Sequence, residues 1–125
     1  MHSIVSLISG RGSNLEAIVK TAAAKSWDVQ FTGVISNNPE AKGLEFARSQ
    51  GISTQVVNHR DFASREAFDQ ALMNEIDRLG ADLIVLAGFM RILTPAFIKH
   101  YEGRMINIHP SLLPLYPGLH THQRA

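Results

Sequence analysis

Apolar and polar positions alternate along this chain in short blocks that predict strands and helices in turn. Runs rich in apolar residues at 4–8, 31–35, 54–57, 83–87 and 105–108 have the length of buried strands. Between them, apolar residues recur at helical spacing; in the longest such stretch Phe68, Leu72, Ile76 and Leu79 form one stripe that would face a core. The pattern predicts an α/β fold, with a doubly wound, mostly parallel sheet covered by helices on both faces.

Capping residues mark where these helices should begin. Ser64 is expected to cap the longest helix and Thr94 a short one. Asn38 followed by Pro39 predicts another cap, with proline at the first helical position of a helix that stops at Gly51. Connections are short and no linker, repeat or low-complexity segment interrupts them, so residues 1–125 are expected to form a single domain.

Three segments that carry candidate chemistry, 9–15, 88–93 and 106–118, each follow or include the end of a predicted strand. In doubly wound sheets, ligands bind at the carboxyl ends of the strands, near the point where the strand order reverses. The three segments should therefore meet at one edge of the sheet and build one site.

The first segment, Ser9-Gly10-Arg11-Gly12-Ser13-Asn14-Leu15, has the character of an anion-binding loop. Its glycines allow close approach of a ligand, and N–H groups at a helix N-terminus favour negative charge. It lacks the full dinucleotide fingerprint and the lysine of an ATP-binding loop, which favours a single phosphomonoester. The alternative is a tight turn followed by an ordinary helix cap.

The third segment places Asn107 and His109 two residues apart at the end of a strand, and therefore on the same face. An amide that donates a hydrogen bond, beside an imidazole that moves protons, is the minimum apparatus for stabilising an oxyanion during proton transfer. The alternative is a satisfied core histidine beside a turn asparagine.

The amino-acid sequences of these segments resemble those of the folate-dependent formyltransferases. Asn-Ile-His-Pro-Ser-Leu-Leu-Pro at 107–114, followed by Tyr-Pro-Gly at 116–118, resembles the wider formyl-transfer group. The blocks at 9–15 and 86–93, with Ser-Arg-Glu-Ala-Phe at 64–68, narrow the resemblance to the branch that acts on glycinamide ribonucleotide. The resemblance runs the whole length of the chain and implies a Rossmann-like formyltransferase fold.

The resemblance implies transfer of a formyl group from 10-formyltetrahydrofolate, the co-substrate, to the amine of glycinamide ribonucleotide in purine biosynthesis, without a metal. It makes Asn107 and His109 catalytic, the first as a donor to the oxyanion and the second in proton transfer. It assigns the substrate phosphate to Gly12, Ser13 and Asn14, and the folate to a surface bordered by Arg65, Met90, Arg91, Ile92, Leu93 and Asn107.

The family's domain continues beyond position 125, with further strands and an aspartate that completes the catalytic group. The chain is therefore expected to be the N-terminal portion of that domain, with an apolar strand edge that favours self-association as a homodimer, an aggregate or a swapped form. Three alternatives stay open. They are an inactive ribonucleotide-binding module, a formyltetrahydrofolate hydrolase, which carries an extra N-terminal domain, and a methionyl-tRNA formyltransferase, which needs a basic surface.

Composition narrows the classes of partner. With 12 basic and 11 acidic residues the net charge is +1, so no bulk field attracts nucleic acid or an anionic membrane. The absence of cysteine excludes disulfides and thiolate chemistry. No secretory signal or apolar run of about 20 residues is present, which favours a cytoplasmic protein.

Histidines outside the 106–118 segment carry weaker signals. His120 and His122 alternate as metal ligands can, yet no Cys, Asp or Glu cluster accompanies them, so no metal is expected. His2, His59 and His100 are isolated and are predicted to lie on the surface.

Overall fold

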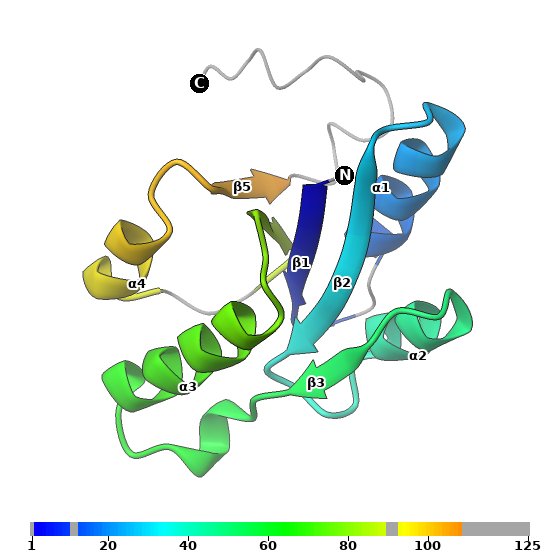
Figure 1. Cartoon of the computed structure of the whole chain (residues 1–125). Helices are drawn as coiled ribbons and strands as arrows, with labels where there is room; N and C mark the ends of the chain where they lie inside the picture. The colour runs from blue at the N-terminus through cyan, green and yellow to red at the C-terminus, as the bar shows by residue number, and fades with distance from the viewer. Residues whose placement is uncertain (1, 11–12, 90–92, 109–125) are drawn as a thin grey trace.

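The computed structural model describes residues 2–10, 13–89 and 93–108, and its elements follow the predicted alternation (Figure 1). They are β1 (His2–Ile8), α1 (Ser13–Ala24), β2 (Val29–Ser36), α2 (Lys42–Ser49), β3 (Thr54–Val56), the short 3-10 helix η1 (His59–Asp61), α3 (Arg65–Arg78), β4 (Leu83–Ala87), α4 (Pro95–His100) and β5 (Met105–Ile108). None of the helices within these ranges is long and apolar enough to cross a membrane.

The strands form one sheet in the order β3-β2-β1-β4-β5, and every pairing is parallel. The order reverses between β1 and β4, which makes this the switch point of a doubly wound sheet. Helices α1 and α2 cover one face and α3 and α4 the other (Figure 1). The predicted fold class is confirmed.

Burial along β1 explains why its sequence from Ile4 to Ile8 is apolar apart from Ser6. Every residue from Ile4 to Ile8 is buried. Val5 and Leu7 belong to the core under α3 and α4, whereas Ile4 and Ile8 belong to the core under α1 and α2. A central parallel strand has no solvent-facing side, so the period-two polar pattern of a surface strand is absent.

Two predicted helix caps are confirmed and one is wrong. Ser64 Oγ accepts a hydrogen bond from the Ala67 N–H at 3.0 Å, and Thr94 caps α4 in the same way. The predicted cap at Asn38 fails because its side-chain oxygen accepts from the Glu40 N–H at 3.0 Å and closes a tight turn. Helix α2 begins only at Lys42, without a side-chain cap.

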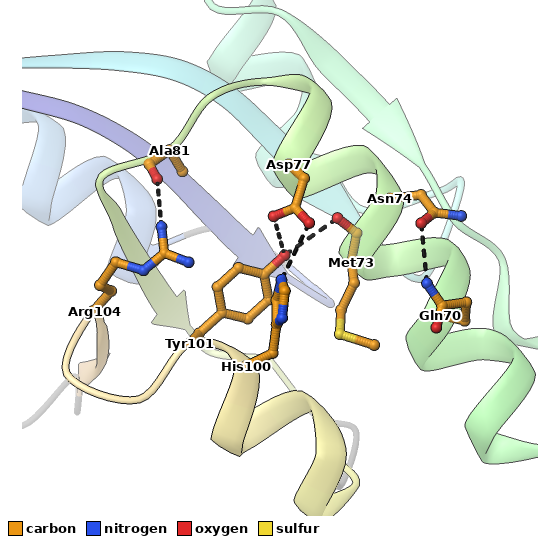
Figure 2. A network of polar contacts seen from close by, with 8 residues as sticks. All are labelled: Gln70, Met73, Asn74, Asp77, Ala81, His100, Tyr101 and Arg104. Carbon is orange, nitrogen blue, oxygen red and sulfur yellow. Dashed lines mark hydrogen bonds and ion pairs between the residues drawn. The ribbon is translucent and has the colours of Figure 1, made fainter.

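A polar network fixes α4 and the start of β5 against α3 (Figure 2). The hydroxyl of fully buried Tyr101 donates to Asp77 Oδ1 at 2.8 Å, with the Met73 carbonyl oxygen 3.2 Å away. His100 Nε2 lies 3.1 Å from the other Asp77 oxygen, and the Arg104 guanidinium sits 5.1 Å from the centre of the Tyr101 ring. The strand that carries Asn107 therefore starts from a braced turn.

Strand β5 is the last strand in the order of the described sheet, as the sequence predicted for the fifth strand. Its Ile106 side chain is 42% exposed. Self-association through this edge stays a prediction.

Candidate functional site at the carboxyl edge of the sheet

Strand register brings Asn107 level with the end of β1. Leu86 of β4 is aligned with Leu7 on one side and with Asn107 on the other. Aligned residues of parallel strands point to the same face, so Asn107 lies on the face of α3 and α4. Its side chain is exposed. His109 lies outside the described residues, so its predicted place beside Asn107 stays a prediction.

The segments after β1 and β4 meet at the switch point. Asn14, in the first turn of α1, is buried, with only 7% of its surface exposed. A Cβ added to Gly88, the first residue after β4, would stand 3.5 Å from Asn14 Nδ2. Of the predicted phosphate ligands, Asn14 is thus placed at the switch point and Ser13 begins α1, while Gly12 lies outside the described residues.

The predicted folate side is partly described. Arg65 is the exposed first residue of α3, and Asp69 stands one helical turn further on, on the same side of the helix. Asp69 Oδ2 accepts a hydrogen bond from the Thr94 N–H at 2.7 Å, immediately after the 88–93 segment. Arg65 therefore starts a helix whose first turns contact the end of that segment, which is compatible with its predicted role.

Within the 88–93 segment, the residues Met90, Arg91 and Ile92 lie outside the described residues. Leu93 and Phe89 are partly buried and pack against the core under α3 and α4. Their core contact accounts for their apolar character, and the role of Leu93 at the folate stays a prediction.

Asp69 was not identified from the sequence. It is 1% exposed, and its Oδ1 atom has no hydrogen-bond partner among the described residues. A buried carboxylate is costly unless it is hydrogen-bonded, and its observed bond joins α3 to the residue that caps α4. The sequence pattern did not indicate burial at this position, because an acidic residue next to Phe68 of the apolar stripe is expected on the solvated face of the helix.

The connection between β2 and α2 holds the start of the 9–15 loop, which the sequence did not indicate. Ser9 Oγ donates to Asn37 Oδ1 at 2.6 Å, and the Asn37 N–H donates to the Ile8 carbonyl oxygen at 3.4 Å. The Gly43 N–H donates to the Gly10 carbonyl oxygen at 3.2 Å. Residues 8 and 9 are therefore bonded to this connection, and Gly10 to the first turn of α2.

A pocket of about 250 Å³ opens beside this contact, at the ends of β1, β2 and β3. It is lined by Ser9, Asn37, Asn38, Pro39, Asn58, His59 and Arg60. His59 was predicted to stand alone at the surface; it lies at the surface of this pocket, but it does not stand alone. The residue is only partly exposed, and its ring lies 3.3 Å from the Asn37 side chain.

Histidines and acids form no group that could hold a metal ion within residues 2–10, 13–89 and 93–108. His100 pairs with Asp77, as described above, and His120 and His122 lie outside these ranges.

Comparison with known proteins gives consistent matches. A family model described as Formyl transferase matches residues 2–125. Phosphoribosylglycinamide formyltransferase of Escherichia coli (strain K12) is 54% identical over 123 residues, which cover 98% of this chain and 58% of that protein. The trifunctional purine biosynthetic protein adenosine-3 of Drosophila melanogaster is 47% identical over 121 residues, 95% of this chain and 9% of that protein.

Solved structures agree with the sequence matches. The phosphoribosylglycinamide formyltransferase of Coxiella burnetii, solved in complex with CHES, superposes with a TM-score of 0.83 at 52% identity, over 99% of this chain and 58% of that one. The enzyme from Brucella melitensis gives a TM-score of 0.82, also at 52% identity, over 99% of this chain and 65% of that one. The chain thus spans somewhat more than half the length of the three bacterial relatives.

Proposed function

The chain belongs to the formyl transferase family, and from that premise we propose that the protein transfers a formyl group from 10-formyltetrahydrofolate to the amine of glycinamide ribonucleotide, a step of purine biosynthesis. The names of its relatives support the substrate and the reaction class. The observation that carries the proposal is the convergence at the switch point, where Asn14 lies against Gly88 and Asn107 is level with Leu86 on the adjacent strand.

The reaction needs an attacking amine, a formyl carbon and a leaving nitrogen on the folate. The amine forms a bond to the formyl carbon, and the carbonyl oxygen becomes a tetrahedral oxyanion. Asn107 donates a hydrogen bond to that oxygen, a contribution typically of about 10²–10³ in rate. Its exposure at the end of β5 leaves the amide free of the core, as a substrate contact requires.

Proton movement completes the reaction. The attacking amine loses a proton and the departing folate nitrogen gains one when its bond to the formyl carbon breaks. His109 is proposed to deliver that proton, an effect worth roughly 10²–10⁴ in rate. No covalent enzyme intermediate and no metal is needed.

Ribonucleotide binding is proposed at Gly12, Ser13 and Asn14, where the first turn of α1 presents N–H groups to the phosphate. The folate is proposed to border Arg65 and the residues Met90, Arg91, Ile92 and Leu93. The contact of Asp69 with Thr94 supports this arrangement, because it joins the helix that begins at Arg65 to the end of the 88–93 segment.

The decisive experiment removes the proposed proton-transfer group in the intact protein. His109→Ala should lower turnover by about 10²-fold or more, while ribonucleotide binding measured by titration calorimetry is retained. His2→Ala is the matched control, since His2 is an exposed histidine at the amino end of β1, opposite the edge of the sheet that carries the site. Near-normal turnover of the His109 variant would refute the assignment.

The same calorimetry tests the alternative of an inactive binding module. Binding of glycinamide ribonucleotide by a wild-type protein that transfers no formyl group would favour the module over the enzyme. A hydrolase would instead release formate from the folate without needing the ribonucleotide.

A further inference from the structure

A chain of side-chain contacts runs from η1 through the end of β2 to the 9–15 loop. Asn37 is 5% exposed, and its Oδ1 accepts the hydrogen bond from Ser9 Oγ at 2.6 Å. Its Nδ2 lies 3.3 Å from Nδ1 of His59, in η1. One buried amide thus joins a partly buried imidazole to the first residue of the 9–15 loop.

The imidazole of His59 can hydrogen-bond to Asn37 whichever of its ring nitrogens carries the proton. His59 Nδ1 is 3.3 Å from Asn37 Nδ2, a donor, and 3.3 Å from the Asn37 carbonyl oxygen, an acceptor. Without a proton on Nδ1 the ring accepts from the amide, and with one it donates to the carbonyl. The ring is therefore a brace for Asn37 in both forms.

Backbone bonds extend the brace along the loop. The Asn37 N–H reaches the Ile8 carbonyl oxygen, and the Gly43 N–H reaches that of Gly10. A cradle of N–H groups binds a phosphate well only when the groups are already aimed, because ordering a loose loop on binding costs affinity. Gly10 has no side chain to hold it, and a Cβ built there would meet no described residue within 4 Å, so its position depends on these backbone bonds.

We propose that Asn37 and His59 are positioning residues for the ribonucleotide phosphate, acting through Ser9 and Gly10. The inference rests on the proposed function, because it takes the 9–15 loop to be the phosphate site. Neither residue touches the reacting atoms. Their loss should therefore weaken ribonucleotide binding and leave the chemical step and the folate site unchanged.

Steady-state kinetics of the intact protein separate this role from a merely structural one. Asn37→Ala should raise the KM for glycinamide ribonucleotide by about tenfold, with kcat and the KM for the formyl donor changed less than about twofold. Asn74→Ala is the matched control, because that exposed amide on α3 bonds only to Gln70 among the described contacts. A parallel rise of both KM values, or a fall in kcat alone, would overturn the proposal.

Two substitutions at His59 test the brace atom by atom. The side-chain amide of an asparagine at position 59 would lie near the position of the imidazole Nδ1, whereas that of a glutamine would lie near the position of Nε2. His59→Asn should keep the wild-type KM for the ribonucleotide, and His59→Gln should raise it several-fold. Equal values for the two variants would overturn the role of Nδ1. These variants also decide the matter if thermal unfolding shows that Asn37→Ala does not fold.

Calorimetric titration with glycinamide ribonucleotide distinguishes failure of the inference from failure of the proposed function. A wild-type protein that binds no ribonucleotide would overturn both. Wild-type binding that the Asn37 and His59 variants retain in full would overturn the inference alone. Tenfold weaker binding by Asn37→Ala, with binding of the formyl donor unchanged, is the expected result.

Discussion

Gly88 lies against Asn14 across the switch point of the sheet, so close that a Cβ on the glycine would stand 3.5 Å from the asparagine Nδ2. That distance is ordinary van der Waals contact, so the described residues leave room for one more carbon. The backbone of Gly88, however, has a φ of +77°, which L side chains rarely adopt. Conformation, and not space, requires glycine at this point.

Gly88→Ala should accordingly destabilise the protein by roughly 1–2 kcal/mol through backbone strain. Urea denaturation measures the change. Gly10→Ala is the control, since Gly10 has no positive φ and an added Cβ would meet no described residue within 4 Å, so this change should cost much less. Equal stability of the two variants would show that Gly88 relaxes without strain.

Asp69→Ala should destabilise by about 1–3 kcal/mol, because it leaves the N–H of buried Thr94 without its acceptor. Asp69→Asn keeps an acceptor oxygen and should lose less. Comparing the two by thermal unfolding isolates the hydrogen bond from the packing. Equal losses for the two variants would mean that an acceptor oxygen without the charge does not hold this contact.

Tyr101→Phe should destabilise at neutral pH by about 0.5–1.5 kcal/mol, since the hydroxyl loses its bond to Asp77. The same network predicts a pH dependence. Burial, and then the bond to Asp77 and its negative charge, raise the pKa of Tyr101 well above its ordinary value of 10.0. The folded protein holds a proton that the unfolded chain releases in alkali, so this stability is complete below pH 10 and declines above it.

Urea denaturation between about pH 8 and about pH 11 checks this sign. The free energy of unfolding of the wild type should fall more steeply above pH 10 than that of Tyr101→Phe, which has no hydroxyl to ionise. Parallel curves would contradict the raised pKa.

Asn107→Ala should lower kcat by about 10²–10³, the usual cost of one lost donor to an oxyanion, while the KM for ribonucleotide changes little. Ile106→Ala, at the neighbouring position of β5 and also exposed, should leave kcat near the wild-type value. Similar losses in both variants would point to damage of the strand and not to loss of the amide.

Local pattern was sufficient where the structure depends on local chemistry. The strand at 83–87 and the caps at Ser64 and Thr94 were predicted correctly. Burial on both faces and side-chain capping depend on residues that are close in the sequence. The cap predicted at Asn38 was wrong, because an asparagine before proline can equally close a turn on its own backbone.

The brace on the 9–15 loop could not be predicted in this way. Ser9, Asn37 and His59 come from three separate connections, and nothing local indicates that they meet. Only the strand order β3-β2-β1 brings the three strand ends side by side. Asp69 was missed for a related reason, since its partner Thr94 lies 25 residues away.

The pairing of β1 with β4 also governs how the protein folds. Ser6 Oγ donates to the Val85 carbonyl oxygen across 79 residues of chain, a contact whose loop-closure entropy is large. The pairing of β1 with β2 and that of β2 with β3 close shorter loops, so that half of the sheet is expected to fold first, including during synthesis. The contact between Asn14 and Gly88 would then be among the last parts of the structure to form. A change that slows the pairing of β1 with β4 would reduce the yield of folded protein, but the molecules that do fold would have unchanged activity.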